Sequence, residues 1–341
     1  MIQIINAPLD KNLVVVWHPW TWKTVAAVHR FVRLYKEGKK VLFLCYNNLL
    51  RQWILKVLLN EFKLSEYIKN NVRTLDSFFG KIQRKYYSDE REPKYVNKMS
   101  LEEINNLIDY YKTIEQYDAI IIDEWQDFSL EILENLEKLT NHISIFMDKL
   151  QIINVFLWHT SIDYEFLEEQ KDYRLLFLYK NYRTPRNIYE TAFSWFVSEN
   201  EDLMYTESII STEWKLDRVK DINIKEIVDD IVKFWETNKW SLWVFLNKIV
   251  NVENLYSIMS ERLGKSNVRM YTSRDKEEDI DFHNKIIITT FKSAKWLEFD
   301  NVIVLITPED RGLENINKQL FVLSTRTRNN IKFYFLNDNQ L

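Results

Sequence analysis

Glycine is scarce in this sequence. It occurs 4 times among 341 residues, whereas tryptophan occurs 12 times. Average usage of about 7% would give roughly 24 glycines. Glycine adopts positive φ angles at no steric cost. A loop that needs such angles can therefore be recognised when a bulky residue occupies a position where glycine is expected. The positions of the tryptophans therefore indicate which loops lack the glycine they require.

Cysteine is also scarce, and long apolar runs and an excess of basic charge are absent from the sequence. Cys45 is the single cysteine, which excludes structural disulfides within the chain and indicates a reducing compartment. No apolar run approaches the length of a membrane span, and residues 1–11 lack the layout of a signal peptide. These features predict a soluble, cytoplasmic protein with no membrane partner. The net charge of −4 excludes a globally basic nucleic-acid binder, but a local groove lined by amides, aromatics and a few cations stays open.

Residues 16–24 form the most informative segment and read V-W-H-P-W-T-W-K-T. With glycine at Trp17, Trp20 and Trp22, residues 17–24 would read G-H-P-G-T-G-K-T, which matches the Walker A phosphate-binding loop. That loop wraps phosphates with backbone N–H groups, and its glycines permit positive φ and close approach to the ligand. An indole at any of the three positions would cost strain or occupy the phosphate's space.

The two residues that close this loop are those that a nucleotide site requires. Lys23 would reach the β- and γ-phosphates, and the Thr24 hydroxyl would sit on Mg²⁺. A helix follows directly, so its N-terminus would point toward the phosphates. The sequence therefore predicts an ATP and magnesium site, while its tryptophans, if genuine, would disable that site.

The same exchange recurs at other motifs of the chain. Trp125 stands in D-E-W-Q-D, Trp296 in K-W-L-E-F, and Trp158 where a related motif ends in glycine. One cause explains them all: a UGA codon that the host reads as glycine and that is translated here as tryptophan. The alternative is a protein that carries genuine tryptophans and does not hydrolyse ATP. Real indoles are plausible in helical, apolar contexts at Trp53, Trp195 and Trp235.

The first half of the chain alternates short apolar runs with helical patterns. Strand, crossover helix and strand in series predict a parallel sheet with helices on both faces. Ligands of such sheets bind beyond the carboxyl ends of the strands, where the motifs of this half fall. The expected strands are residues 13–16, 40–45, 119–123 and 143–148, and the expected helices are residues 24–37 and 49–62.

The second half predicts another α/β unit. Its apolar runs are residues 175–179, 243–247, 285–290, 301–306, 319–324 and 332–336. We place the boundary near Lys171, which gives one domain of residues 1–171 and another of residues 172–341. Residues of about 81–116 form a small inserted element in the first domain.

Asp123 and Glu124 follow four apolar residues at the end of an expected strand. This is the placement of a Walker B pair, in which Asp123 holds Mg²⁺ and Glu124 orients or deprotonates the attacking water. An acidic pair at a strand end is often no more than solvated surface. Gln126 and Asp127, which complete D-E-x-Q-D, make the assignment much more specific.

With these motifs, the chain resembles the UvrD/Rep-like branch of superfamily 1 helicases across almost its whole length. Two further motifs carry the resemblance: N-Y-R-T at residues 181–184 resembles N-Y-R-[ST], and S-T-R at residues 324–326 resembles V-T-R-A. The resemblance implies two tandem RecA-like P-loop domains, each a mainly parallel sheet flanked by helices. It also implies that ATP binds in the cleft between them, with Arg183 and Arg326 as arginine fingers that stabilise charge on the γ-phosphate.

The resemblance assigns roles at other positions as well. Gln151, in D-K-L-Q, would couple the γ-phosphate to the strand site, and Glu298 would bond the ribose. Residues 17, 20 and 22 would line the nucleotide. The positions that match strand-contacting motifs of the family are Tyr46, Asn47, Thr74, Phe78, Phe156, Thr290 and Lys292.

Several positions depart from the family pattern. Asp76 and Lys292 replace histidines, and an acid at position 76 would repel a phosphate. Met147 replaces a glycine. Gln3 is a poorly spaced candidate for the family's adenine-reading glutamine, and the large helical insertions of many relatives are short or absent.

The function that the resemblance implies is ATP-driven movement along single-stranded DNA, with RNA left open. Duplex unwinding is less assured because the insertions are short. Two alternatives remain: an ATP-dead scaffold that binds single strands or a partner protein, and an ATPase switch in a DNA repair or defence assembly that does not move processively.

Overall fold

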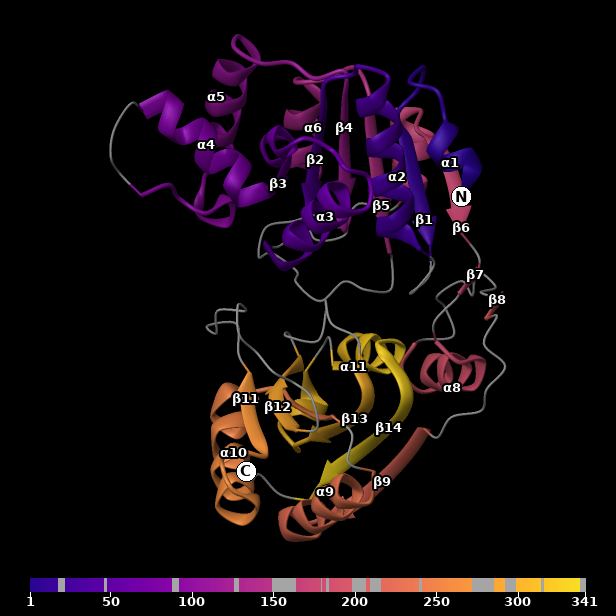
Figure 1. The fold of residues 1–341 in the computed structure, drawn as a ribbon, viewed down its shortest axis with the longest axis vertical. Helices are drawn as coiled ribbons and strands as arrows, with labels where there is room; N and C mark the ends of the chain where they lie inside the picture. The colour runs from indigo at the N-terminus through magenta and orange to yellow at the C-terminus, as the bar shows by residue number, and fades with distance from the viewer. Residues whose placement is uncertain are drawn as a thin grey trace. The chain divides into compact units, whose positions relative to one another are not determined.

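The computed structural model describes residues 1–17, 22–45, 48–87, 92–125, 129–148, 164–178, 180–181, 184–197, 207–208, 216–238, 241–271, 285–291, 299–313 and 316–337. The chain divides into two compact units, Met1–Tyr179 and Lys180–Leu341 (Figure 1). Each unit is built around its own sheet.

The first unit contains a six-stranded sheet in the order β3-β2-β4-β5-β1-β6, and every pairing in it is parallel. Strands that pair in parallel need crossover connections, which the helices of this unit supply. The strands are β1 (Leu13–Trp17), β2 (Val41–Cys45), β3 (Val72–Thr74), β4 (Ala119–Asp123), β5 (Ile143–Met147) and β6 (Arg174–Leu178).

Both faces of this sheet are buried. Successive strand residues point to opposite sides, and the residues on each side are apolar and are covered by helices. Val14 and Val16 of β1 join one apolar cluster with α4 to α7, whereas Leu13 and Val15 join another with α1 to α3. The helices are α1 (Ile2–Asn6), α2 (Lys23–Lys36), α3 (Asn48–Asn60), α4 (Leu75–Tyr87), α5 (Leu101–Lys112), α6 (Leu130–Glu137) and α7 (Tyr164–Lys171). The strand pattern alone thus explains the three-layer arrangement.

The last strand of this sheet corrects the expected start of the second unit. β6 pairs with β1 along its whole length, from Leu13 opposite Arg174 to Trp17 opposite Leu178. The apolar pattern of the sequence predicts residues 175–179 in the second unit and a boundary near Lys171. A short apolar run looks the same in either sheet, and its partner strand lies about 160 positions earlier, so local sequence does not reveal the pairing.

The inserted element is helical and is pinned by polar side chains. It comprises the end of α4, a short 3₁₀ turn (Val96–Lys98) and α5. The Gln83 amide donates to the Lys94 carbonyl and accepts from the Lys94 N–H, both at 2.9 Å. Ser100 and Glu103 form a reciprocal capping box that begins α5. A second 3₁₀ turn (Glu66–Asn70) leads into β3.

The second unit also contains a six-stranded parallel sheet, in the order β11-β12-β10-β13-β14-β9. A separate two-stranded pair joins β7 (Lys180–Asn181) and β8 (Glu207–Ser208). The sheet strands are β9 (Leu216–Ile222), β10 (Leu242–Leu246), β11 (Val268–Tyr271), β12 (Ile286–Thr290), β13 (Phe299–Ile306) and β14 (Thr327–Leu336).

Helices cover both faces of this second sheet. α9 and α10 pack on one face through an aliphatic cluster, and α8 and α11 on the other through aromatic rings, as where Phe196 meets Phe333 at 5.1 Å between ring centroids. The helices are α8 (Arg186–Phe196), α9 (Ile224–Asn238), α10 (Ile249–Leu263) and α11 (Ile316–Thr325), with a 3₁₀ turn at Asp310–Gly312. Of the expected apolar runs, residues 319–324 lie inside α11.

The fold class expected from the sequence is confirmed: the chain consists of two tandem α/β units of RecA-like type, each a parallel sheet flanked by helices. Among the helices that the structure describes, none is both long and apolar enough to cross a membrane.

Candidate nucleotide-binding site

The carboxyl edge of the first sheet gathers the predicted nucleotide residues. β1 ends at Trp17, α2 begins at Lys23, and β4 ends at Asp123. In the sheet, β5 lies between β1 and β4, which separates the two strands by about 10 Å. The first turn of α2 bridges this gap: the Thr24 hydroxyl donates to Asp123 Oδ2 at 2.7 Å, although the two residues are 99 positions apart.

Lys23 lies between the two carboxylates of the expected Walker B pair. Its Nζ is 3.4 Å from Asp123 Oδ1 and forms a second ion pair with Glu124. All three side chains are nearly or fully buried. Two acids and one lysine leave this buried group with one formal negative charge, which suits a divalent cation next to bound phosphates.

The electrostatics of Asp123 follow from its position. Burial raises the pKa of the Asp123 carboxyl above its ordinary value, while Lys23 opposes that shift. A carboxylate that is costly to keep ionised without a cation favours binding of one. Thr24 and Asp123 together supply a hydroxyl and a carboxylate oxygen, which are ligands that Mg²⁺ accepts. The residues present thus fit a magnesium–nucleotide complex.

The backbone at position 22 has a left-handed conformation, which glycine adopts without steric cost. Trp22 has φ 53° and ψ 28°, in the left-handed region, and its side chain is 51% exposed. A residue with a Cβ in this region costs roughly 1–2 kcal/mol. The structure therefore places a positive φ directly before Lys23, where the sequence comparison with Walker A expects glycine.

Glu124 is a second strained position in the site, with φ 61°. Its side chain is nevertheless buried and paired with Lys23. A non-glycine residue in the left-handed region persists only where its surroundings hold it, and such residues gather at functional sites. The turn after β4 thus holds the Glu124 carboxylate next to the lysine.

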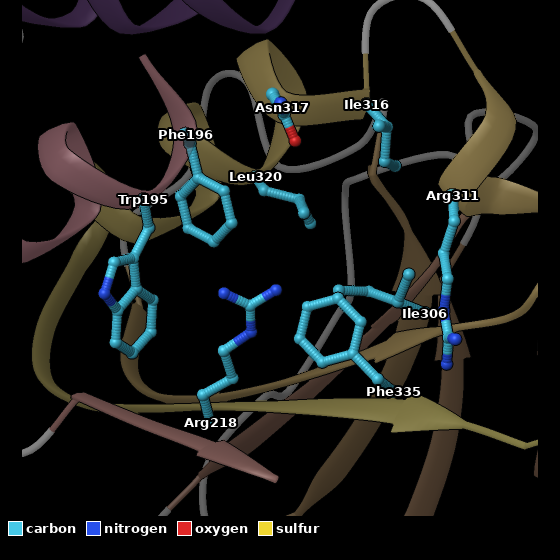
Figure 2. A pocket seen from close by; sticks show the side chains of 9 residues that line it. All are labelled: Trp195, Phe196, Arg218, Ile306, Arg311, Ile316, Asn317, Leu320 and Phe335. Carbon is cyan, nitrogen blue, oxygen red and sulfur yellow. The ribbon is translucent and has the colours of Figure 1, made fainter. Parts of the chain in front are cut away.

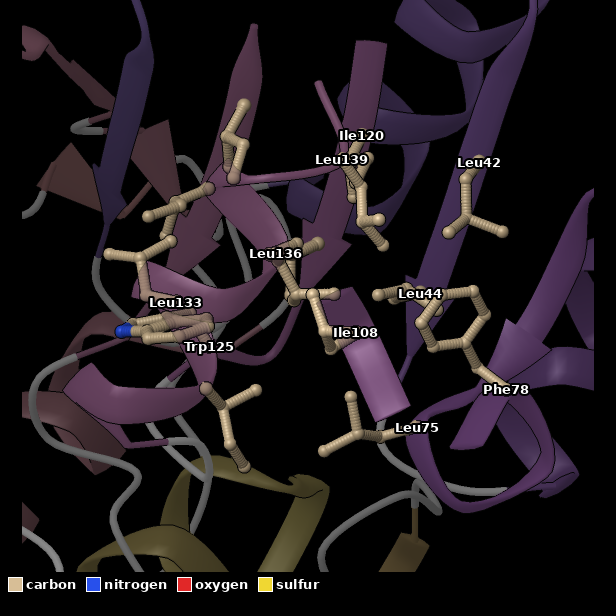
Figure 3. Close-up of a cluster of buried hydrophobic side chains, with 14 of the residues drawn as sticks. Leu42, Leu44, Leu75, Phe78, Ile108, Ile120, Trp125, Leu133, Leu136 and Leu139 are labelled. Carbon is tan, nitrogen blue, oxygen red and sulfur yellow. The ribbon is translucent and has the colours of Figure 1, made fainter. Parts of the chain in front are cut away.

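Trp125 differs from Trp22 in both backbone and side chain. Its φ is not positive, and its indole is 1% exposed within the apolar cluster that also contains Leu133 and Leu136 of α6. Figure 3 shows the ring beside Leu133. Position 125 therefore has no backbone requirement for glycine, and an indole fills its surroundings.

Two other predicted motif residues reach the same edge of the sheet. Asp148 follows β5 and is fully buried. Thr74 is the last residue of β3 and directly precedes α4. Its hydroxyl accepts a hydrogen bond from the Ser77 N–H at 3.1 Å, in the first turn of that helix. Thr74 therefore has a structural role at the helix start beside any contact with a strand.

Phe78 is not available for the strand contact that the resemblance implies. Its side chain is fully buried, with its ring 5.6 Å from both the Phe79 and the Tyr111 ring centroids. The apolar face of α4 must cover the sheet, so Phe78 packs in the core instead. Asp76, which replaces the family's histidine, accepts the Val96 N–H at 2.9 Å and thereby fastens the inserted element.

In the second unit, two predicted motif segments meet. The Thr184 hydroxyl donates to the Thr325 carbonyl at 3.0 Å, which joins N-Y-R-T to S-T-R. Arg326 follows at the end of α11 with a buried side chain, and its carbonyl accepts the Phe299 N–H at 3.1 Å. Thr290, the last residue of β12, is also buried; it lies at the carboxyl edge of this sheet.

Several predicted site residues lie outside the part of the chain that the structure describes, as does the side chain of Trp17. Their roles remain predictions. They are Trp20, Tyr46, Asn47, Gln151, Phe156, Arg183, Lys292 and Glu298.

A buried polar network beneath α2 was not anticipated from the sequence. Arg30 is fully buried and donates to the carbonyls of Ile4 and Ala7 and to Ser144 Oγ. Its Nη2 lies 2.9 Å from His142 Nε2. An arginine in the middle of an apolar helix face is the signal that could have indicated it. The network ties α1 to the amino edge of the sheet, away from the nucleotide residues.

Comparison with known proteins gives structural likeness only. No protein-family model matches the chain, and no curated protein matches it. Among solved structures, the C-terminal domain of a possible DNA helicase from Lactobacillus plantarum WCFS1 is 20% identical, over 46% of this chain and 88% of that one, with a TM-score of 0.35. The PRRSV helicase is 12% identical over 100% of this chain, which spans 55% of that protein, with a TM-score of 0.48. Likeness at this level does not specify a substrate.

Proposed function

We propose that this chain is an ATP-dependent translocase on single-stranded nucleic acid, a DNA helicase of the UvrD-like type. The observation that carries the proposal is the meeting of Lys23, Thr24, Asp123 and Glu124 at one edge of the first sheet. Two distant segments supply four groups that P-loop ATPases use for phosphoryl transfer to water: a lysine, a hydroxyl, a metal-binding carboxylate and a second carboxylate.

Each of these side chains has a separate task in the proposal. Lys23 would turn from the carboxylates to the β- and γ-phosphates, and Thr24 and Asp123 would hold Mg²⁺. Glu124, released from Lys23, would accept a proton from the attacking water. When bound, ATP would supply the phosphoryl group, and Mg²⁺ would offset the negative charge of the phosphates. Arg183 and Arg326 of the second unit would act as the arginine fingers that the family resemblance assigns.

We also infer that residues 17, 20 and 22 are glycines in the protein that the host makes. The positive φ of Trp22 supports this inference, because the loop keeps a glycine-type backbone immediately before Lys23. A host that reads UGA as glycine would produce the complete Walker A sequence. The inference extends to Trp158 and Trp296 but not to Trp125, whose indole is packed in the core.

The half-exposed indole of Trp22 favours one other function if it is genuine. An aromatic side chain beside the phosphate loop would hinder nucleotide binding, and the protein would then act as a scaffold for single strands or a partner. The other alternative is a switch that hydrolyses ATP without moving along a strand. It differs from the translocase in that single-stranded DNA would not stimulate its ATP turnover.

The test compares the chain as printed with a variant carrying Trp17→Gly, Trp20→Gly and Trp22→Gly, assayed for ATP hydrolysis with and without single-stranded DNA. We expect turnover only in the glycine variant, with strong stimulation by the strand. Turnover that ignores the strand would support the switch, and no turnover in either protein would support the scaffold.

Two further variants of the glycine protein connect any turnover to this site. Lys23→Ala is expected to abolish it, whereas Lys36→Ala, an exposed lysine in the last turn of the same helix, is expected to leave it unchanged. Full turnover in Lys23→Ala would refute the assignment.

A further inference from the structure

The second unit contains a cavity that the proposed motor chemistry does not use. It has a volume of about 320 Å³, near the lower limit of roughly 300–1,000 Å³ that small-ligand pockets show. It lies on the sheet face covered by α8 and α11 and is lined by residues from those helices, from β9, β13 and β14, and from the 3₁₀ turn at Asp310–Gly312 (Figure 2). These residues include Trp195, Arg218, Ile306, Arg311, Leu320 and Phe335.

The alternation of strand residues explains why a cation enters this face. Val219 of β9 packs in the aliphatic cluster on the opposite side, so its neighbour Arg218 must point toward α8 and α11. The Arg218 guanidinium lies 4.5 Å from the Phe335 ring centroid and 5.6 Å from that of Trp195. Two aromatic rings thus hold the planar guanidinium in place at the cavity.

A second guanidinium flanks the same aromatic ring. Arg311 lies 5.6 Å from the Phe335 centroid and donates to the Leu336 carbonyl. Within the described part of the chain, neither Arg218 nor Arg311 has a carboxylate partner, and no acidic residue lines the cavity. Some other described cations of this unit do have one, as Arg262 has Asp229 and Lys248 has Glu309. Figure 2 shows the Phe335 ring between the two guanidinium groups. An anion that binds at Arg218 would be attracted most strongly by that guanidinium and more weakly by Arg311.

We propose that this cavity binds a short acidic segment of a partner protein, with a carboxylate on Arg218 and an adjacent apolar side chain on the aliphatic wall, while Arg311 adds positive charge from the other side of the Phe335 ring. The arginine fork matches a carboxylate in a bidentate geometry. Ile306, Ile316 and Leu320 supply an apolar wall beside the cations. Asn317, at the start of α11, is the remaining polar group available to the backbone of the segment.

The lining favours a peptide over a nucleic-acid strand. A strand presents a phosphate at every nucleotide and is bound by a groove that tracks the backbone, with aromatic faces for the bases. This cavity has two cations and no lysine. The faces of Phe335 and Trp195 are already in contact with guanidinium groups, so they offer little stacking surface to a base.

The experiment uses the full chain and three labelled probes, followed by fluorescence anisotropy. One probe is a pool of hexapeptides with a fixed central Leu-Glu and random flanks. The second is the matched pool with Leu-Gln, and the third is an oligothymidylate. The proteins are the parent, Arg218→Gln, Arg311→Gln and the matched control Arg262→Gln, which changes an exposed arginine of α10 outside the cavity.

We expect the Leu-Glu pool to bind the parent and Arg262→Gln saturably, and to bind Arg218→Gln at least about tenfold more weakly, the loss typical of a charged hydrogen bond. Arg311→Gln should weaken binding by a smaller factor, because Arg311 lies on the other side of the Phe335 ring. The Leu-Gln pool should show the same loss on the parent. Equal binding of the two pools, no binding of either, or no difference between Arg218→Gln and Arg262→Gln would overturn the proposal. Weaker binding of the oligothymidylate alone in Arg218→Gln would assign the cavity to the strand instead.

This site is independent of the nucleotide residues. Arg218→Gln is expected to retain the ATP turnover of its parent in the absence of peptide. Failure of the motor proposal would therefore leave the peptide result unaffected, and the reverse also holds.

Discussion

The Nζ of Lys23 lies 3.4 Å from Oδ1 of Asp123, inside a site where the carboxylate is fully buried. Glu124 completes the group as the second partner of the lysine. A buried lysine between two acids offsets one of their two negative charges while no phosphate is present. Binding of a nucleotide would therefore exchange one set of anions around the lysine for another, and the two carboxylates would then become available to metal and water.

Glu124→Gln in the glycine-bearing protein tests the role of the second carboxylate. We expect ATP binding to persist and turnover to fall by about 10²–10⁴-fold, the range that a general base contributes. The amide keeps the size of the side chain, so the fold should be unaffected. Nucleotide binding measured by fluorescence, together with phosphate release, separates the two steps.

Glu102→Gln serves as the control, since Glu102 is an exposed acid in the first turn of α5 and should leave both quantities unchanged. If Glu124→Gln retained full turnover, another group would have to activate the water.

The free energy of unfolding should show that glycine suits position 22 and does not suit position 125. Because Trp22 has φ 53°, Trp22→Gly should stabilise the first unit relative to Trp22→Ala by about 1 kcal/mol, since alanine keeps the left-handed strain. Trp125→Gly should destabilise it by at least about 3–5 kcal/mol, because it removes a buried indole and leaves a cavity. Urea unfolding of the full-length variants measures both changes. Equal stability of Trp22→Gly and Trp22→Ala would show that position 22 does not need glycine.

Protein purified from the native host gives a direct test of the same distinction. Mass spectrometry of the tryptic peptide of residues 12–23 should show glycine at positions 17, 20 and 22. The peptide of residues 113–138 should show tryptophan at position 125, where the indole is 1% exposed. Tryptophan at all four positions would remove the decoding hypothesis, and glycine at all four would mean that α6 packs differently in the native protein.

Much of this fold was readable because its signals are local. The sequence predicts the apolar strands β1 and β4 within one residue. The Walker-type spacing also indicates Lys23, Thr24, Asp123 and Glu124, which are in contact in the structure. Chemistry that depends on a short motif at a strand end needs no knowledge of distant pairing.

Features that depend on distant partners were missed. β6 was assigned to the wrong unit because only its pairing with β1 decides its sheet. Phe78 matched a strand-contacting motif, but the inserted helices bury it against Tyr111. The cavity cations Arg218 and Arg311 belong to no motif, and they line one cavity only because β9 and the 3₁₀ turn after β13 lie on either side of Phe335 of β14.

His142 should make the stability of the first unit depend on pH. Burial, together with the charge of Arg30, lowers the pKa of His142 from 6.5 to about 3. Arginine can only donate, so Nε2, 2.9 Å from Arg30 Nη2, must accept and the folded histidine is neutral. The unfolded chain binds a proton here below pH about 6.5 and the folded chain does not. The free energy of unfolding therefore falls as the pH falls from about 6.5 toward 3, by up to about 1.4 kcal/mol per pH unit.

His142→Gln removes this proton from the unfolded state. Its destabilisation relative to the parent should be about 2 kcal/mol smaller at pH 5 than at pH 7.5. Urea unfolding of the full chain at a series of pH values measures the difference, with the transition of the first unit assigned by amide exchange in β5. Ser144→Ala, which removes a hydroxyl from the same network but keeps the histidine, should retain the parent's pH dependence. An identical slope in His142→Gln and the parent would mean that another group carries it, because a neutral buried histidine is the only member of this network that gains a proton on unfolding in that range.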